Sequence, residues 1–180
     1  MSTRIIHRLY WDFEKEELWL NEMAAKGLDL VRYRWGTYTF EQAEPGEWIY
    51  RIELLPESAR KPASRRYLEF MADSGVQTVA TYMSWVYFRK RAADGPFELY
   101  SDMDSRIAHY TRVLRLYGSL TTALVATTAS SLHSVTLNGL NFFTLPLFVV
   151  QIAILVACAA YALRVAARVR SLKAQKQLFE

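Results

Sequence analysis

Residues 116–132, LYGSLTTALVATTASSL, and residues 140–163, LNFFTLPLFVVQIAILVACAAYAL, decide how the rest of the chain is organised. Neither run contains Lys, Arg, Asp or Glu, and nor do residues 133–139 between them. About 20 apolar helical residues, each advancing about 1.5 Å, cross a hydrocarbon core about 30 Å thick. The sequence therefore predicts a two-helix transmembrane hairpin over 116–163, with helices at about 116–132 and 140–163 and an outer loop at 133–139.

Basic residues flank this hairpin on both sides. Arg106, Arg112 and Arg115 lie in an expected juxtamembrane helix over 101–115, and five Lys and Arg residues follow in a basic tail over 164–180. Because Lys and Arg concentrate on the cytoplasmic side of membrane proteins, both termini are expected in the cytoplasm. The predicted location is a cell membrane, crossed twice. The first ten residues lack the apolar segment of a signal peptide.

Charge and cysteine content exclude several function classes. Residues 1–105 carry 14 Lys and Arg against 17 Asp and Glu, a net charge of −3, whereas residues 106–180 carry +7. The basic pI thus belongs to the membrane region, and no direct nucleic-acid binding is expected. The single cysteine, Cys158, lies in the second apolar run, which excludes an intramolecular disulfide and a cysteine metal site. No cofactor motif is present, so no cofactor is expected.

Residues 1–100 predict an α+β domain in the cytoplasm. Strands are expected near residues 5–11, 28–40, 48–55 and 76–91, and helices at 13–26 and 65–74. Glu44-Pro45-Gly46-Glu47 predicts a type II turn that closes a long hairpin. This order favours a ferredoxin-like antiparallel sheet sandwich, with residues 97–100 as an added edge strand. No internal repeat is evident.

Aromatic residues fall on both faces of the predicted strands. Two helices on one face of a sheet leave the other face open, so some of these rings are expected to form a platform for a ligand or a protein partner. The alternative is structural packing against a second copy or against the juxtamembrane helix. The candidate binding residues are Trp35, Tyr38, Trp48, Tyr50, Trp85 and Tyr87.

Small residues recur every four positions in the first apolar run, and alanines do so in the second. Such stripes let membrane helices approach closely, so they predict helix packing within the hairpin and a possible homodimer. Small residues are also common in membrane helices without this role. The packing candidates are Gly118, Thr122, Ala126, Ser130, Ala153 and Ala157.

Catalysis is the alternative interpretation. Asp102 and His109 are seven residues apart, so they share one helix face, and with Asp104 they could bind a divalent cation at the membrane surface. The acids that begin the first helix, among them Glu16 and Glu17, could act as paired carboxylates. Helix-start acids and an interfacial histidine account for both groups without catalysis. No catalytic residue is assigned.

Several motifs resemble the bacterial membrane proteins called "domain of unknown function 2812". They are YWDFEKEE at 10–17, WLNEMAAKG at 19–27, EPGE at 44–47, WVYFRK at 85–90, DGPF at 94–97 and SDMDS at 101–105. The resemblance implies a possible PadR-like transcriptional regulator as partner, and it implies no activity, cofactor or catalytic residue. The expected function is a membrane-anchored cytoplasmic binding or regulatory module.

Overall fold

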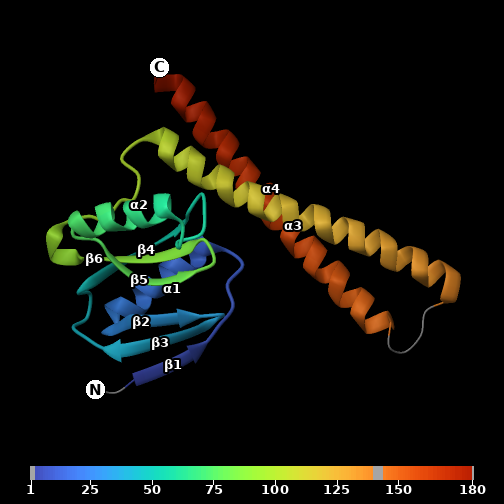
Figure 1. Cartoon of the computed structure of the whole chain (residues 1–180), viewed down its shortest axis with the longest axis horizontal. Helices are drawn as coiled ribbons and strands as arrows, with labels where there is room; N and C mark the ends of the chain where they lie inside the picture. The colour runs from blue at the N-terminus through green and yellow to red at the C-terminus, as the bar shows by residue number, and fades with distance from the viewer. Residues whose placement is uncertain (1–2, 140–143, 180) are drawn as a thin grey trace. The chain divides into compact units, whose positions relative to one another are not determined.

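The structure, a computed structural model, describes residues 3–139 and 144–179 and divides the chain into two compact units, Met1–Ser101 and Asp102–Glu180. The first unit contains all the strands that are described, together with two α-helices and one 3-10 turn (Figure 1). Its elements are β1 (Thr3–His7), α1 (Phe13–Ala25), β2 (Leu28–Arg34), β3 (Thr37–Gln42), β4 (Trp48–Leu54), α2 (Pro62–Asp73), β5 (Gln77–Tyr82), β6 (Trp85–Arg91) and η1 (Ala92–Asp94).

The strands form two three-stranded antiparallel sheets. The first sheet has the order β1-β3-β2 and the second has the order β4-β6-β5. The α+β class and the antiparallel pairing are therefore confirmed. The prediction of a single ferredoxin-like sheet is wrong, because β3 and β4 do not pair and each sheet contains only its own three strands.

The single-sheet prediction missed two short turns that lie inside aromatic segments. Residues 28–40, expected to form one kinked strand, make a hairpin that turns at Trp35 and Gly36, and residues 76–91 turn at Met83. Neither turn carries the Asn-Gly or Asp-Gly pair that marks a two-residue hairpin. The expected turn at 44–47 exists, with Gly46 at φ 76, but it connects the two sheets. Residues 97–100 form no strand.

The two sheets are repeats of one βαββ unit. The first repeat is β1-α1-β2-β3 and the second is β4-α2-β5-β6, and the strand orders are the same. Adding 48 to a residue number in the first hairpin gives its equivalent in the second. Each hairpin has a register shift at the equivalent valine, Val31 in β2 and Val79 in β5. The Leu55 N–H bonds the Ser84 carbonyl as the Arg8 N–H bonds the Gly36 carbonyl, each at 2.8 Å.

Helix α1 begins at the expected place and packs on both repeats. The Asp12 carboxylate caps it by accepting from the backbone N–H groups of Glu14 and Lys15. Its apolar face contacts both sheets, so one core joins the repeats. This core contains Trp19, Leu20, Met23, Ala24, Leu30, Tyr38, Phe40, Trp48, Tyr50, Ile52 and Tyr87.

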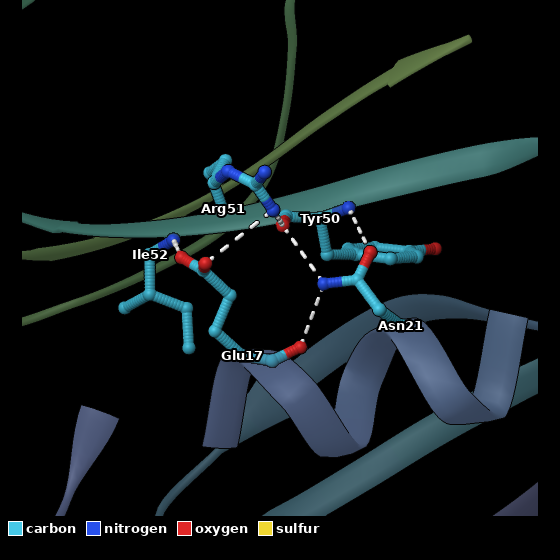
Figure 2. A network of polar contacts seen from close by, with 5 residues as sticks. All are labelled: Glu17, Asn21, Tyr50, Arg51 and Ile52. Carbon is cyan, nitrogen blue, oxygen red and sulfur yellow. Dashed lines mark hydrogen bonds and ion pairs between the residues drawn. The ribbon is translucent and has the colours of Figure 1, made fainter. Parts of the chain in front are cut away.

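Polar side chains of α1 also cover the open edge of β4, which is an edge strand of the second sheet (Figure 2). The Asn21 amide accepts from the Tyr50 N–H at 2.8 Å and donates to the Tyr50 carbonyl at 3.1 Å. The Glu17 carboxylate accepts from the Ile52 N–H at 2.9 Å and lies 3.4 Å from the Arg51 guanidinium. Asn21 thus makes the pair of bonds that a neighbouring strand would make, which blocks further strand pairing here.

The other face of the second sheet has its own small core beneath α2. Met71 of α2 packs with Val86 and Phe88 of β6 and with Phe97, the residue expected in an edge strand. Pro62 occupies the first turn of α2, where its missing N–H costs nothing. The second sheet is therefore covered on both faces.

The second unit consists of two 36-residue helices, α3 (Met103–Asn138) and α4 (Thr144–Phe179), which pack as an antiparallel pair. The loop expected at 133–139 is helical to Asn138, because it contains no helix breaker before Gly139. The tail expected from 164 continues α4, because residues 164–179 contain neither Gly nor Pro. The expected helix start at residue 140 lies outside the described residues.

Among the described residues, α4 is the one helix that is long and apolar enough to cross a membrane. The span is Thr144–Leu178, with a mean hydropathy of 2.3 in its most apolar window and 6% of that window buried. An apolar helix that stays exposed is unlike the buried helix of a protein core.

The edge contact predicts a stability loss. Asn21→Ala leaves the Tyr50 N–H and carbonyl without the amide, and we expect the free energy of unfolding to fall by about 1–3 kcal/mol. Chemical denaturation of the full chain in detergent, followed by tryptophan fluorescence, measures this. Glu22→Ala, at an exposed neighbouring position of α1, is the control and should change the free energy by less than about 0.5 kcal/mol. Equal effects of the two variants would contradict the role of Asn21.

Candidate functional site

A buried carboxylate connects the two repeats. Glu16 of α1 accepts a hydrogen bond from the Tyr38 hydroxyl at 2.6 Å and one from the Tyr87 hydroxyl at 2.7 Å. Tyr38 lies in the first sheet and Tyr87 in the second. The Tyr33 ring contacts both tyrosines, with centroid distances of 4.8 and 4.5 Å. A single side chain of α1 thus holds an aromatic group from each sheet.

Burial is the main influence on the pKa of the Glu16 carboxyl group. Loss of solvation raises the pKa of Glu16, and the two tyrosine hydrogen bonds oppose that rise. Burial, followed by the charge of Glu16, also raises the pKa of Tyr38 and Tyr87 far above the usual tyrosine range. All three side chains are less than 8% exposed. No substrate can reach them in this conformation, so the cluster acts as a structural connection.

Trp48 and Tyr50 belong to the same closed core. The Tyr50 hydroxyl accepts from the Leu30 N–H at 2.9 Å, and burial raises the pKa of Tyr50 to about 12. The Arg89 guanidinium lies 4.1 Å from the Trp48 ring centroid and 3.6 Å from Asp29. Burial raises the pKa of Asp29 to about 6, although Arg89 opposes the shift.

Large exposed apolar side chains lie at the tips of the two hairpins. Trp35 is 71% exposed and Met83 is 75% exposed, and the two residues are equivalent in the two repeats. The Trp35 ring contacts Tyr82, the neighbour of Met83, with centroids 6.1 Å apart, so the tips lie side by side. Leu9, 70% exposed, lies against Gly36, where an added Cβ would be 2.5 Å from the leucine methyl. We call Leu9, Trp35 and Met83 the tip surface.

The backbone of the tip surface is strained. Trp35 has φ 44 and Met83 has φ 55, and these are the two non-glycine residues with positive φ within 3–139 and 144–179. A left-handed conformation costs a bulky residue about 1–2 kcal/mol, and Asn or Gly would satisfy the same turn more easily. Backbone strain beneath exposed apolar side chains is typical of functional positions, so the tip surface is the best candidate for binding.

The six aromatic residues expected to bind are therefore divided by the structure. Tyr38, Trp48, Tyr50 and Tyr87 are buried, Trp85 is partly buried against Phe13, and Trp35 is exposed. The binding role of these residues stays a prediction, and in this conformation it can concern mainly Trp35. Sequence reasoning missed Met83, because its importance depends on the second turn.

The sheet face that no helix covers is mainly polar, with Ile5 of β1 as an exposed apolar residue on it. In the first sheet, Tyr38 and Phe40 point into the core, so Thr37, Thr39 and Glu41 of the same strand point outward. Aromatic rings were expected on such a face. They are inside because two small sheets and α1 together offer more interior faces than one sheet does.

The residues of the metal alternative have other contacts. Asp102 caps α3 by accepting from the Ser105 N–H at 2.7 Å, and this bond lowers its pKa. Asp104 lies 2.8 Å from Lys176. Burial, followed by the charge of Arg112, lowers the pKa of His109 to about 3. Across the part of the chain that the structure describes, no three His, Cys, Asp or Glu residues form a group that could hold a metal ion.

The two helices of the second unit pack through residues other than the small-residue stripes. Thr122, Ala126, Ser130, Ala153 and Ala157 are exposed, and a Cβ added at Gly118 would meet nothing within 4 Å. Their packing role therefore stays a prediction, and within the pair of α3 and α4 other residues make the contacts.

The contacts between α3 and α4 follow a different line. The Tyr117 and Tyr161 rings lie 4.5 Å apart, and the Gln151 amide donates to Thr127 at 2.9 Å and accepts from Ser131 at 3.2 Å. Buried residues of α4 recur at the seven-, four- and three-residue steps of a heptad seam: Cys158, Val165, Val169 and Leu172.

A weak sequence signal of the repeat does exist. Met-Ala-x-x-Gly occurs at 23–27 and again at 71–75, and the equivalent pairs Val31 with Val79 and Phe40 with Phe88 are identical. The two glycines both have positive φ just after a helix. These few matches identify the repeat once the registers are known.

Comparison with known proteins gives one match. A family model described as "Protein of unknown function (DUF2812)" matches residues 12–122, which is more than half of the chain and agrees with the resemblance noted in the sequence. No curated protein and no solved structure matches the chain.

The buried carboxylate predicts a pH-dependent stability. Because the pKa of Glu16 is raised above its ordinary value of 4.5, the folded state holds this proton more tightly than the unfolded state does. Its contribution is complete below 4.5 and is lost as the pH rises through the raised pKa. Relative to the wild type, Glu16→Gln should therefore gain stability with rising pH, measured by denaturation at several pH values.

Glu16→Leu is the contrasting variant. It leaves the buried Tyr38 and Tyr87 hydroxyls without their acceptor, at a cost of about 1–3 kcal/mol each. A Leu variant as stable as the Gln variant would show that these hydrogen bonds do not hold the repeats together.

Proposed function

This chain belongs to the DUF2812 family, and we propose that it is a membrane-anchored module that binds a protein partner through the tip surface. The observation that carries the proposal is the pair of exposed, strained apolar residues, Trp35 and Met83, at equivalent positions of the two repeats.

Binding by this surface fits the energetics of interfaces. Exposed aromatic and methionine side chains are typical contact residues, and a rigid turn presents them without a large loss of conformational entropy on binding. The repeats place two such turns beside each other, so one partner can contact both. A PadR-like transcriptional regulator is the partner that the family resemblance suggests.

The proposed anchor is the hairpin of α3 and α4, crossing the membrane twice. α4 has the required length and apolarity. α3 carries no Lys, Arg, Asp or Glu between Arg115 and its end at Asn138. Hydrogen bonds of Gln151 to Thr127 and Ser131 satisfy polar groups within the pair, as the interior of a bilayer requires. With basic residues at both outer ends, both termini face the cytoplasm.

Replacing both tips tests the binding proposal. Trp35→Asn with Met83→Asn retains the left-handed turns with a residue that tolerates them, so the fold should be kept and its stability raised by about 1 kcal/mol. Crosslinking and purification of the tagged full chain from its own membranes, with quantitative mass spectrometry, measures partner recovery. We expect at least a roughly tenfold loss, as for interface hot spots.

The matched control is Phe70→Ala. Phe70 is 64% exposed but lies on α2 in ordinary helical backbone. Its replacement should leave recovery unchanged. If the double Asn variant recovers the same proteins in the same amounts as the wild type, the tip surface is not the binding site.

Cysteine labelling tests the membrane topology. In a Cys158→Ser background, Leu137→Cys near the end of α3 should react with an impermeant maleimide added to intact cells, because it would lie outside. Ala174→Cys in the last part of α4 should react only after the membrane is permeabilised. Labelling of residue 174 alone in intact cells, or of both residues equally, would refute two crossings with cytoplasmic termini.

A further inference from the structure

The outer edge of β1 is an unpaired strand edge. The Arg8 N–H bonds the carbonyl of Gly36, the residue just before β3. Along an antiparallel strand, the backbone groups of successive residues point alternately toward and away from the neighbouring strand. Arg4 and Ile6 therefore direct their backbone groups toward β3, whereas Thr3, Ile5 and His7 direct theirs away from the sheet. Among the described residues, nothing bonds the outward backbone groups of Ile5, and its side chain is 59% exposed.

The second repeat shows how the equivalent edge can be covered. With an offset of 47, Thr3 and Ile5 of β1 correspond to Tyr50 and Ile52 of β4. Those are the residues whose backbone groups bond Asn21 and Glu17 of the preceding helix. In β1, no side chain among the described residues bonds the equivalent backbone groups.

Helix α2 cannot provide that cover in another copy of the chain. Its residues at the positions of Glu17 and Asn21 are Arg65 and Glu69. A carboxylate only accepts and a guanidinium only donates, so neither can make the paired donor and acceptor contact of the Asn21 amide. A neighbouring β-strand supplies both kinds of group in alternation and therefore matches this edge.

We propose that β1 pairs with β1 of a second copy of this chain, antiparallel and centred on Ile5. The two first sheets then form one continuous six-stranded sheet with twofold symmetry. Ile5 exchanges both backbone hydrogen bonds with its own copy, and Thr3 exchanges both with His7 of that copy.

The side chains of β1 suit this register. Ile5 lies opposite Ile5, which buries two exposed apolar groups against each other, and Arg4 lies opposite Ile6, so no two cations are directly opposed. A twofold contact satisfies both edges at once and leaves no new edge, which limits the assembly to two chains. The tip surface is not part of the contact, so the dimer does not depend on the proposed partner binding.

Crosslinking of the full chain in detergent tests the register. Hydrogen-bonded residues in an antiparallel pair have Cα atoms about 5.5 Å apart, which suits a disulfide. In a Cys158→Ser background, Ile5→Cys should form a covalent dimer on mild oxidation. Val31→Cys is the matched control, because Val31 is an exposed valine on the opposite edge strand of the same sheet. Equal dimer yields from the two variants, or no dimer from Ile5→Cys, would overturn the proposal.

A second pair of variants tests the free association. Ile5→Lys places two cations directly opposite each other, so light scattering in detergent should show a monomer where the wild type is a dimer. Val31→Lys, with the same charge on the other edge, should remain dimeric. Both positions are exposed, and unchanged thermal melting would show that the fold is retained. A wild-type monomer, or a dimer that Ile5→Lys leaves intact, would contradict the pairing. Partner recovery by the Trp35→Asn and Met83→Asn variant tests only the binding proposal.

Discussion

The fold of the first unit depends on one helix that belongs to the first repeat and satisfies polar groups in the second. Each successive polar residue on the inner side of α1 has a separate role. Glu16 binds a tyrosine from each sheet, and Glu17 and Asn21 bond the edge of β4. Because buried or edge-facing polar groups are costly when unpaired, these contacts fix how the repeats are placed against each other more specifically than apolar packing alone could.

The repeat also explains where chemistry is available. Duplication of a βαββ unit turns most aromatic residues inward, because each sheet has a covered face and α1 packs against both sheets. The apolar groups left outside include the pair of hairpin tips and the first edge strand. Both are places where the second repeat offers a comparison: Met83 matches Trp35 at the tip, and β4 is covered where β1 is open. The proposals for binding and for self-pairing both come from this internal comparison.

The helical unit follows simpler physics. α4 is apolar over its membrane-length window, while α3 carries many hydroxyl side chains that bond its own backbone carbonyls, as Thr121 bonds Tyr117 and Thr128 bonds Leu124. Such bonds satisfy a polar side chain inside its own helix and make it compatible with an apolar setting. Specific contacts between the helices include those of Gln151 and Tyr161.

By itself, the sequence determined the features that depend on neighbouring residues. Asp12 specified the start of α1, Pro45 and Gly46 specified a turn, and the uncharged runs specified two long helices, of which α4 is apolar enough to cross a membrane. The family also followed from short motifs. Only the tertiary structure decided which strands pair, because Trp35-Gly36 and Met83-Ser84 are weak turn signals and either aromatic segment could have continued as one strand. Strand pairing in turn decided that Tyr38, Tyr50 and Tyr87 are buried while Trp35 and Met83 are exposed, since a ring's position depends on which sheet lies across from it.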